Sequence, residues 1–312
     1  MSKEKLLKCM DDMKAGQYEW NLYFLKIDRR KTNPYAIYKY TFRRSQYFMD
    51  YITTLADITK KYQIEKLEYV EEYNGTNAKT TCDKIDVHNQ LIEEQWNYLC
   101  TSVRDAPREQ VSGKYQGYII DGQPKNEQLP SVTIFKVCNP IISLNQRKKR
   151  VFSYNDNNEL APISDEVCRL YLNIDFAVIG NTLYTFNNKF EDIFNLEKTL
   201  SRLKESAIDQ IIDTHAFGDD EMTKQFMNRY TASKTFLSLK EDRVNKLQSP
   251  DKRRDIASLL HLQFENDKIV INNQKEANYL IKYLCYKIFQ DKETDYLIEV
   301  NNVVKENALA YV

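Results

Sequence analysis

The sequence predicts an α+β fold in which a mixed or mostly antiparallel sheet packs against amphipathic helices. Two segments carry apolar residues at the three-and-four spacing of a helix with one buried face. Shorter runs of aromatic and β-branched residues are joined by tight turns, which is typical of strands in hairpins. Strands and helices do not alternate strictly, so the pattern does not favour a parallel βαβ sheet.

The first predicted helix begins at Ser45. Its apolar residues Phe48, Ile52, Leu55 and Ile58 recur at the spacing that places them on one helix face. We therefore expect this helix to bury that face against the sheet.

Two capping boxes indicate where further helices begin. In such a box, an Asn side chain accepts a backbone N–H three residues later, and the Glu at that later position reaches back. Asn188 with Glu191 and Asn273 with Glu276 have this spacing. The second box is followed by an apolar stripe that consists of Ala277, Leu280, Ile281, Leu284, Cys285 and Ile288.

The clearest predicted hairpin lies at 176–186. Two apolar runs, 176–179 and 182–186, flank Gly180 and Asn181, a two-residue connection suited to a primed turn. Both faces of these strands are largely apolar, so we expect them near the middle of a sheet. A smaller hairpin is expected at 262–271.

The chain length allows either two lobes or one large domain. The polar segment 121–130 contains two prolines and is the strongest boundary signal. It predicts an N-terminal α/β lobe at 1–122, a linker at 123–130 and a C-terminal α+β lobe at 131–312.

The charge balance excludes a protein that attracts nucleic acid through its overall field. Lys and Arg together number 45, as do Asp and Glu, so the formal net charge is zero. Any contact with phosphate would have to come from a local basic patch.

Cysteine usage and hydropathy predict a cytosolic protein. The six cysteines are isolated and form no C-x-x-C motif, which is typical of a reducing compartment. The residues after Met1 are charged, so we expect no secretory signal. No uninterrupted apolar run approaches the roughly 18 residues that a membrane helix needs.

The catalytic inventory is thin, and we predict that the protein is not an enzyme. There are three histidines. His215 lies near Asp219 and Asp220, which together could hold a metal, but a loop histidine beside solvated carboxylates is the favoured interpretation. The sequence contains no Gly-rich phosphate loop and no nucleophile elbow. We therefore predict no catalytic residue, no metal and no cofactor.

A metal-dependent nuclease is the enzyme class that most needs weighing. Such an enzyme places an Asp and a Glu-x-Lys on adjacent strands to hold Mg²⁺ and activate water. Asp175 begins a predicted strand, but no Glu-x-Lys follows it closely. The carboxylates at 65–72 alternate like those on a solvated sheet face, so this class is disfavoured.

Three basic clusters are the candidate DNA contacts. A row of cations at a turn can bind phosphate, although the same row can also serve as a solvated turn that protects a sheet edge. For the densest cluster, at 147–150, the sequence by itself modestly favours the solvated turn. The candidates are Arg147, Lys148, Lys149 and Arg150; Lys252, Arg253 and Arg254; and Arg29, Arg30 and Lys31. In the 252–254 cluster, Asp251 and Asp255 are expected to neutralise part of the charge.

Residues 172–194 carry a family resemblance. The strand Leu-Asn-Ile-Asp-Phe-Ala-Val-Ile at 172–179, the Gly-Asn turn, Leu-Tyr-Thr-Phe-Asn at 183–187 and Phe-Glu-Asp-Ile-Phe at 190–194 follow one another. This series resembles the bacterial family that supplies the soluble second component, protein B, of the Kiwa anti-phage defence system. The hairpin at 262–271 and a predicted closing strand at 294–300 are also similar to that family.

The resemblance implies a non-enzymatic cytosolic effector that binds duplex phage DNA. It further implies self-association, as a homodimer, and a small multi-spanning membrane protein as partner, which would hold the chain at the inner membrane. No catalytic or DNA-contacting residue is carried over by motif, so the basic clusters rest on charge alone.

Three functional hypotheses follow. The first is the DNA-binding defence effector. The second is a protein–protein interaction component without DNA binding, because the chain is neutral and rich in tyrosine. The third is a cryptic metal-dependent nuclease.

Overall fold

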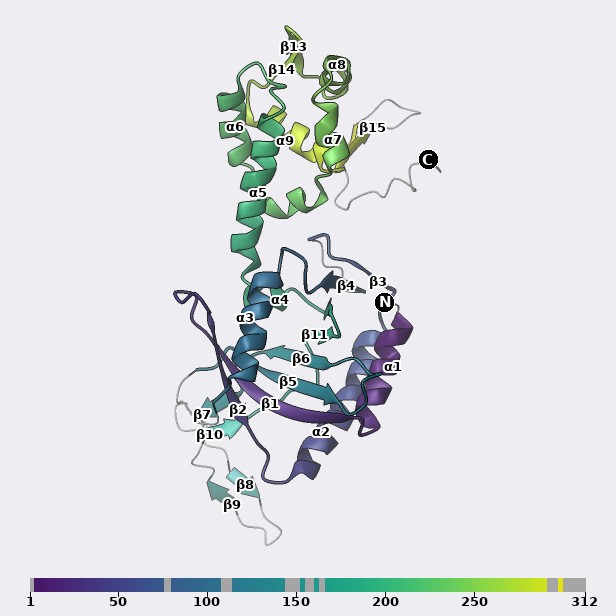
Figure 1. Cartoon of the computed structure of the whole chain (residues 1–312), viewed down its shortest axis with the longest axis vertical. Helices are drawn as coiled ribbons and strands as arrows, with labels where there is room; N and C mark the ends of the chain where they lie inside the picture. The colour runs from purple at the N-terminus through teal and green to yellow at the C-terminus, as the bar shows by residue number, and fades with distance from the viewer. Residues whose placement is uncertain are drawn as a thin grey trace. The chain divides into compact units, whose positions relative to one another are not determined.

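The computed structural model describes residues 3–75, 80–107, 114–143, 152–154, 160–162, 166–290 and 297–299. It contains a mixed eight-stranded sheet, several two-stranded sheets and packed helices, so the predicted α+β class is confirmed (Figure 1). The chain divides into two compact units. The first comprises Met1–Tyr73 and Asn77–Leu196, and the second comprises Asn74–Thr76 and Glu197–Val312.

The first unit is built around the large sheet. Its strand order is β2-β1-β5-β6-β11-β12-β4-β3. Neighbouring strands are antiparallel except β3 and β4, which are parallel. The elements of this unit are α1 (Lys3–Lys14), β1 (Tyr18–Ile27), β2 (Tyr35–Tyr40), α2 (Ser45–Thr59), the π-helix η1 (Lys60–Ile64), β3 (Tyr69–Glu72), β4 (Thr81–Asp86), α3 (Glu93–Arg104), β5 (Gly117–Pro124), β6 (Val132–Val137), β7 (Ile141–Ser143), β8 (Phe152–Tyr154), β9 (Leu160–Pro162), β10 (Glu166–Cys168), β11 (Phe176–Ile179), β12 (Thr182–Thr185) and α4 (Lys189–Ile193).

The helix predicted at Ser45 is α2, and it packs beside α1 (Figure 1). Phe48, Ile52 and Leu55 are buried as expected. On α1, the buried side chains include Leu6 and Met10. The two helices and the sheet share one apolar core, which fixes the position of the N-terminal segment.

The predicted linker at 123–130 differs from what the structure contains. Strands β5 and β6 pair directly across this segment, with Gly122 opposite Val132 and Gly117 opposite Val137. Their residues belong to one sheet and one compact unit, which divides from the second unit at Leu196. The two prolines mark a connection between adjacent strands, and polarity alone cannot distinguish that from a domain boundary.

The hairpin predicted at 176–186 is present as β11 and β12. Phe176 lies opposite Thr185 and Ile179 lies opposite Thr182. Gly180 in the turn has φ +59, which a residue without a Cβ adopts at no steric cost. All four residues of β11 are buried, as expected for a strand in the middle of a sheet.

One of the two predicted capping boxes is absent. Asn188 occupies the N-cap of α4, but its side chain makes no capping hydrogen bond. Its φ of −78° and ψ of 1° differ from the extended N-cap conformation that aims the side chain at the first turn. The neighbouring Asn187 accepts the Lys189 N–H instead, at 3.0 Å. The carboxylate of Glu191 accepts a hydrogen bond from the Tyr73 hydroxyl at 3.0 Å.

The second unit is mostly helical. Its elements are α5 (Leu196–Ile212, which begins at the last residue of the first unit), α6 (Asp220–Asn228), the 3₁₀-helix η3 (Ser233–Ser238), α7 (Glu241–Lys246), α8 (Pro250–Leu259), β13 (Gln263–Glu265), β14 (Lys268–Val270), α9 (Gln274–Leu284), β15 (Ile288–Gln290) and β16 (Leu297–Glu299). The small hairpin predicted at 262–271 is β13 and β14, and the strand predicted at 294–300 contains β16.

Helix α9 forms the centre of this unit. The Asn273 side chain accepts the Glu276 N–H at 3.1 Å, so the second capping box is confirmed on that side. The Glu276 carboxylate reaches back one residue further than expected and accepts the N–H of Asn272 at 2.7 Å. The apolar stripe that follows is buried, with Leu280 and Leu284 inaccessible to solvent.

We predict that Gly122→Ala destabilises the first unit. Trp20 is the cross-strand partner of Gly122, and a Cβ at Gly122 would lie 2.4 Å from Trp20 Cζ3. The indole would have to move, at a cost of about 1–3 kcal/mol in urea-induced unfolding. The same change in a Trp20→Leu background is expected to cost much less, because the ring that causes the clash is gone. Equal costs in the two backgrounds would contradict this explanation.

Candidate functional site

A buried ionic network surrounds Asp175 in the first unit. The Asp175 side chain is 2% exposed, and its Oδ1 accepts hydrogen bonds from Lys136 Nζ at 3.1 Å and Asn187 Nδ2 at 2.8 Å. Its Oδ2 accepts the backbone N–H of Val137 at 2.8 Å and lies 3.5 Å from Lys189 Nζ. The carboxylate therefore has four donors, which is the number that its lone pairs accommodate.

Strand register brings these groups together. Phe176 lies opposite Phe135, so Asp175 just before β11 is beside Lys136 near the end of β6. The Lys136 ammonium also lies 5.4 Å from the centre of the Tyr171 ring, within the range of a cation–π contact. Asn187 follows β12, the other neighbour of β11. One carboxylate thus joins the ends of three adjacent strands.

The network lacks the second carboxylate of a nuclease centre. Two residues before Lys136, where a Glu-x-Lys motif would place its acid, the chain has Ile134, which is buried. Within the ranges that the structure describes, no three His, Cys, Asp or Glu side chains are grouped so that they could hold a metal ion. The chemistry that the Asp175 carboxylate can perform here is to bind and orient its four donors.

The sequence points to Asp175 but not to its partner. Asp175 stands out as the first residue of a predicted strand, whereas nothing in the motifs assigns a role to Lys136. The available signal is a single lysine within the apolar strand Val132–Val137, because a lysine at a buried strand position needs a counter-charge.

His215, the histidine considered for a metal site, contacts one of the two neighbouring aspartates. His215 Nδ1 lies 3.1 Å from Asp220 Oδ2, and the imidazole is exposed. Asp219 instead caps α6, where its Oδ1 accepts the Met222 N–H at 2.9 Å. The arrangement fits a loop histidine beside a helix start.

The six cysteine thiols are free. Burial raises the pKa of Cys9, Cys82 and Cys285 to about 12 in each case. These three side chains are therefore neutral thiols at physiological pH, and they pack as small apolar groups.

The Arg29–Lys31 cluster lies in the turn between β1 and β2. All three side chains are exposed. Arg30 pairs with Asp28, with Nε 2.9 Å from Oδ1, and Arg29 donates to the backbone carbonyl of Asp192 at 2.6 Å.

The second described cluster, Lys252–Arg254, lies in the first turn of α8. Lys252 pairs with Asp255 at 3.2 Å, and Arg254 lies 3.6 Å from Asp267 and 4.0 Å from Asp251. The expected neutralisation by neighbouring carboxylates is thus confirmed.

Arg253 differs from the two cations beside it. Its guanidinium donates to the backbone carbonyls of Leu247, Gln248 and Asp267. It therefore joins the segment before α8 to the β13–β14 turn. The third predicted cluster, 147–150, lies outside the described residues.

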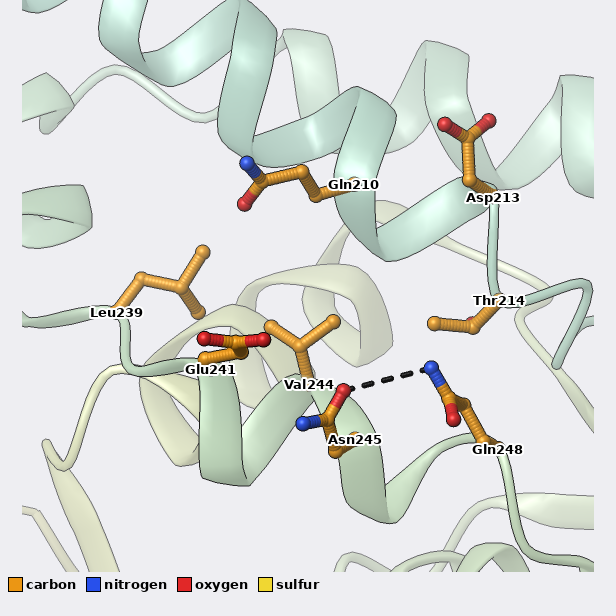
Figure 2. Close-up of a pocket in the computed structure, with 8 residues that line it drawn as sticks. All are labelled: Gln210, Asp213, Thr214, Leu239, Glu241, Val244, Asn245 and Gln248. Carbon is orange, nitrogen blue, oxygen red and sulfur yellow. Dashed lines mark hydrogen bonds between the residues drawn. The ribbon is translucent and has the colours of Figure 1, made fainter.

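An open cleft in the second unit separates the end of α5 from α7 (Figure 2). Its volume is about 450 Å³, and Gln248 Nε2 donates to Asn245 Oδ1 across its edge at 3.4 Å. The described residues that line it include two carboxylates and no cation. They are Gln210, Asp213, Thr214, Leu239, Glu241, Val244, Asn245 and Gln248. Such a lining suits neutral polar or cationic groups and disfavours phosphate.

Comparison with known families shows to which family the chain belongs. The model of the family described as Kiwa protein KwaB-like matches residues 114–290, which is more than half of the chain. The chain belongs to the Kiwa protein KwaB-like family. No curated protein and no solved structure matches it. The resemblance seen at 172–194 is therefore confirmed.

Membership makes the chain a component of the Kiwa anti-phage defence system. The matched region runs from just before β5 to the end of β15. It includes the Asp175 network and the clusters at 147–150 and 252–254, whereas the Arg29–Lys31 cluster precedes it. Among the residues that the structure describes, none of the helices has the length and apolar character needed to cross a membrane.

We predict that breaking the Asp175–Lys136 pair on one side strongly destabilises the first unit. Asp175→Asn leaves the buried Lys136 ammonium without its counter-charge, and Lys136→Met leaves the buried Asp175 carboxylate with only the partly exposed Lys189 as a counter-charge. Each change is expected to cost about 3–5 kcal/mol in urea-induced unfolding. The double variant is expected to cost less than the sum of the two.

The matched control is an exposed pair. Asp255→Asn breaks the contact with Lys252, whose side chain is 59% exposed, and should cost less than about 1 kcal/mol. Additive single-variant costs at Lys136 and Asp175 would show that the two side chains are not coupled.

Proposed function

We propose that this chain is a non-enzymatic, DNA-binding effector of the Kiwa system that acts as a homo-oligomer with a small multi-spanning membrane protein. The observation that carries the proposal is the family match over residues 114–290. The chain would work in the cytosol and be held at the inner membrane by that partner.

Local charge is the physical basis for DNA binding. The net charge is zero, so affinity has to come from clusters that meet the phosphate backbone. Two cations of the 252–254 cluster, Lys252 and Arg254, are paired with exposed carboxylates. Exposed pairs of this kind are worth about 0–1 kcal/mol, so phosphates can replace those carboxylates at little cost.

The contacts within the cluster at 252–254 assign different roles to its members. Lys252 and Arg254 have exposed side chains and can turn to phosphate. Arg253 is engaged with three backbone carbonyls and supports the local fold. Variants that test DNA binding should therefore change Lys252 and Arg254 and leave Arg253 intact.

The alternative without DNA binding is a protein–protein interaction component. It is supported by the neutral charge and the intramolecular pairing of the cations. It predicts stable co-purification with the membrane partner and no retention of duplex DNA.

We expect affinity for a random-sequence duplex to fall steeply with salt. Replacing Lys252 and Arg254 by Gln should lower the slope of log K against log salt by about 0.9 for each phosphate that the variant no longer binds. Replacing the cations at 147–150 or at 29–31 by Gln should lower the slope in the same way. The slope is measured by fluorescence anisotropy at several salt concentrations.

The matched control neutralises Lys198 and Arg202, two cations on α5 in the same unit. This pair should leave the slope unchanged. A wild-type chain that does not bind duplex DNA, or binds it without salt dependence, would contradict DNA binding and favour the interaction component.

We also expect that the chain has no nuclease activity, and plasmid cleavage tests this. Supercoiled plasmid incubated with a large excess of the chain and Mg²⁺ or Mn²⁺ is expected to stay intact, because the position two residues before Lys136 is Ile134 and not a carboxylate. Nicking that Asp175→Asn abolishes, in a variant shown to be folded, would establish the nuclease instead.

A further inference from the structure

The π-helix η1 carries an exposed aromatic side chain, Tyr62, directly after the buried face of α2. In α2 the buried positions include Leu55, Ala56 and Thr59. Continued α-helical spacing would turn residue 62 or 63 inward. In the wider turn of η1, Gln63 is half-buried and its side chain exchanges two hydrogen bonds with the Ile174 backbone. Ile64 is buried, and Tyr62 is 52% exposed.

Contacts from α1 hold this turn at both ends. At its start, Lys60 Nζ donates to both carboxylate oxygens of Asp11, at 2.9 and 2.8 Å. At its end, Lys3 Nζ donates to the carbonyls of Glu65 and Leu67, at 2.8 and 2.7 Å. These contacts therefore hold the backbone around Tyr62 in place in the absence of a ligand.

Two lysines gather around the exposed ring. The ammonium groups of Lys61 and Lys66 lie 5.2 and 5.3 Å from the centre of the Tyr62 ring. Both lysines are exposed, and within the described part of the chain neither forms an ion pair with a carboxylate. The group thus combines a flat aromatic surface with two positive charges that form no ion pair among the described residues.

We propose that Tyr62, Lys61 and Lys66 form a stacking site for an unpaired base of single-stranded DNA. A base stacks on one face of the tyrosine, and the lysine displaced from that face contacts the adjacent phosphate. This combination of an aromatic platform with flanking cations suits single strands, since a base in a duplex has both faces covered by its neighbours. The inference rests on the proposed function and adds a substrate form to it.

The site is independent of the features already described. It lies before residue 114, outside the region that the family model matches, and it shares no residue with the three basic clusters. An unpaired segment would be met at the end of a DNA molecule or where a duplex is opened.

Another exposed tyrosine provides a matched control. Tyr69 on β3 is also 52% exposed and belongs to the same unit. Among the described residues, no cation lies over the Tyr69 ring. Tyr69 is the first residue of β3, and the last two residues of this strand are Glu71 and Glu72. Tyr69→Leu removes the same ring at the same exposure without disturbing a lysine pair.

The test uses the full chain and fluorescence anisotropy with two probes, an oligothymidylate of about 15 nucleotides and a random-sequence duplex. Tyr62→Leu is expected to weaken single-strand binding roughly tenfold and leave duplex binding unchanged. Tyr62→Phe should retain single-strand binding, because the ring remains. Replacing Lys61 and Lys66 by Gln should lower the single-strand salt slope by about 0.7 for each phosphate that is no longer bound.

The outcomes separate this site from the proposed function. Normal single-strand binding by Tyr62→Leu, or an equal loss in Tyr69→Leu, would overturn the stacking site while duplex binding stands. A loss of membrane-partner binding in Tyr62→Leu with single-strand affinity intact would also overturn it and identify a protein contact. A wild-type chain that binds neither probe would remove the proposed function and this site together.

Discussion

The first unit depends on a single buried carboxylate. Asp175 lies where three adjacent strands of the sheet end, and it gathers two ammonium groups, one amide and one backbone N–H. Taking Asp175 and Lys136 out of water is costly unless each is paired and hydrogen-bonded. That cost penalises any other register of β6 against β11, because a shift of one residue would separate Lys136 from Asp175 and leave the buried ammonium without its counter-charge. The network therefore specifies the arrangement of the strands and need not contribute much net stability.

The charged residues on the surface determine which contacts with DNA the chain could make. A neutral chain has no long-range attraction for DNA, so the proposed contacts with DNA have to form at short range. At 252–254 the outer cations hold exposed carboxylates weakly, whereas the central Arg253 serves the fold. Around Tyr62 the two lysines face an aromatic ring and, within the described part of the chain, form no ion pair with a carboxylate. These two kinds of surface suit different forms of DNA, backbone contacts for the duplex and stacking for single strands.

Much of the fold could be predicted because it follows from local rules. The face of α2, the hairpin around Gly180 and the start of α9 at Asn273 are each encoded within about a dozen neighbouring residues. Two predictions were wrong where the surrounding fold, and not the local sequence, decides the conformation. Asn188 has the spacing of a cap, yet its backbone conformation prevents one, and the polar connection after β5 joins two paired strands.

The candidate sites divide in the same way. Sequence alone was enough for the α+β class, for the family through residues 172–194 and for the positions of the cationic clusters, because these are properties of short stretches. The pairing of Lys136 with Asp175 emerged only in three dimensions, since the two are 39 residues apart and meet through strand register. The exposure of Tyr62 also required the folded chain, because contacts with α1 accompany a π-turn that no local periodicity predicts. In each case the missing information was a long-range contact.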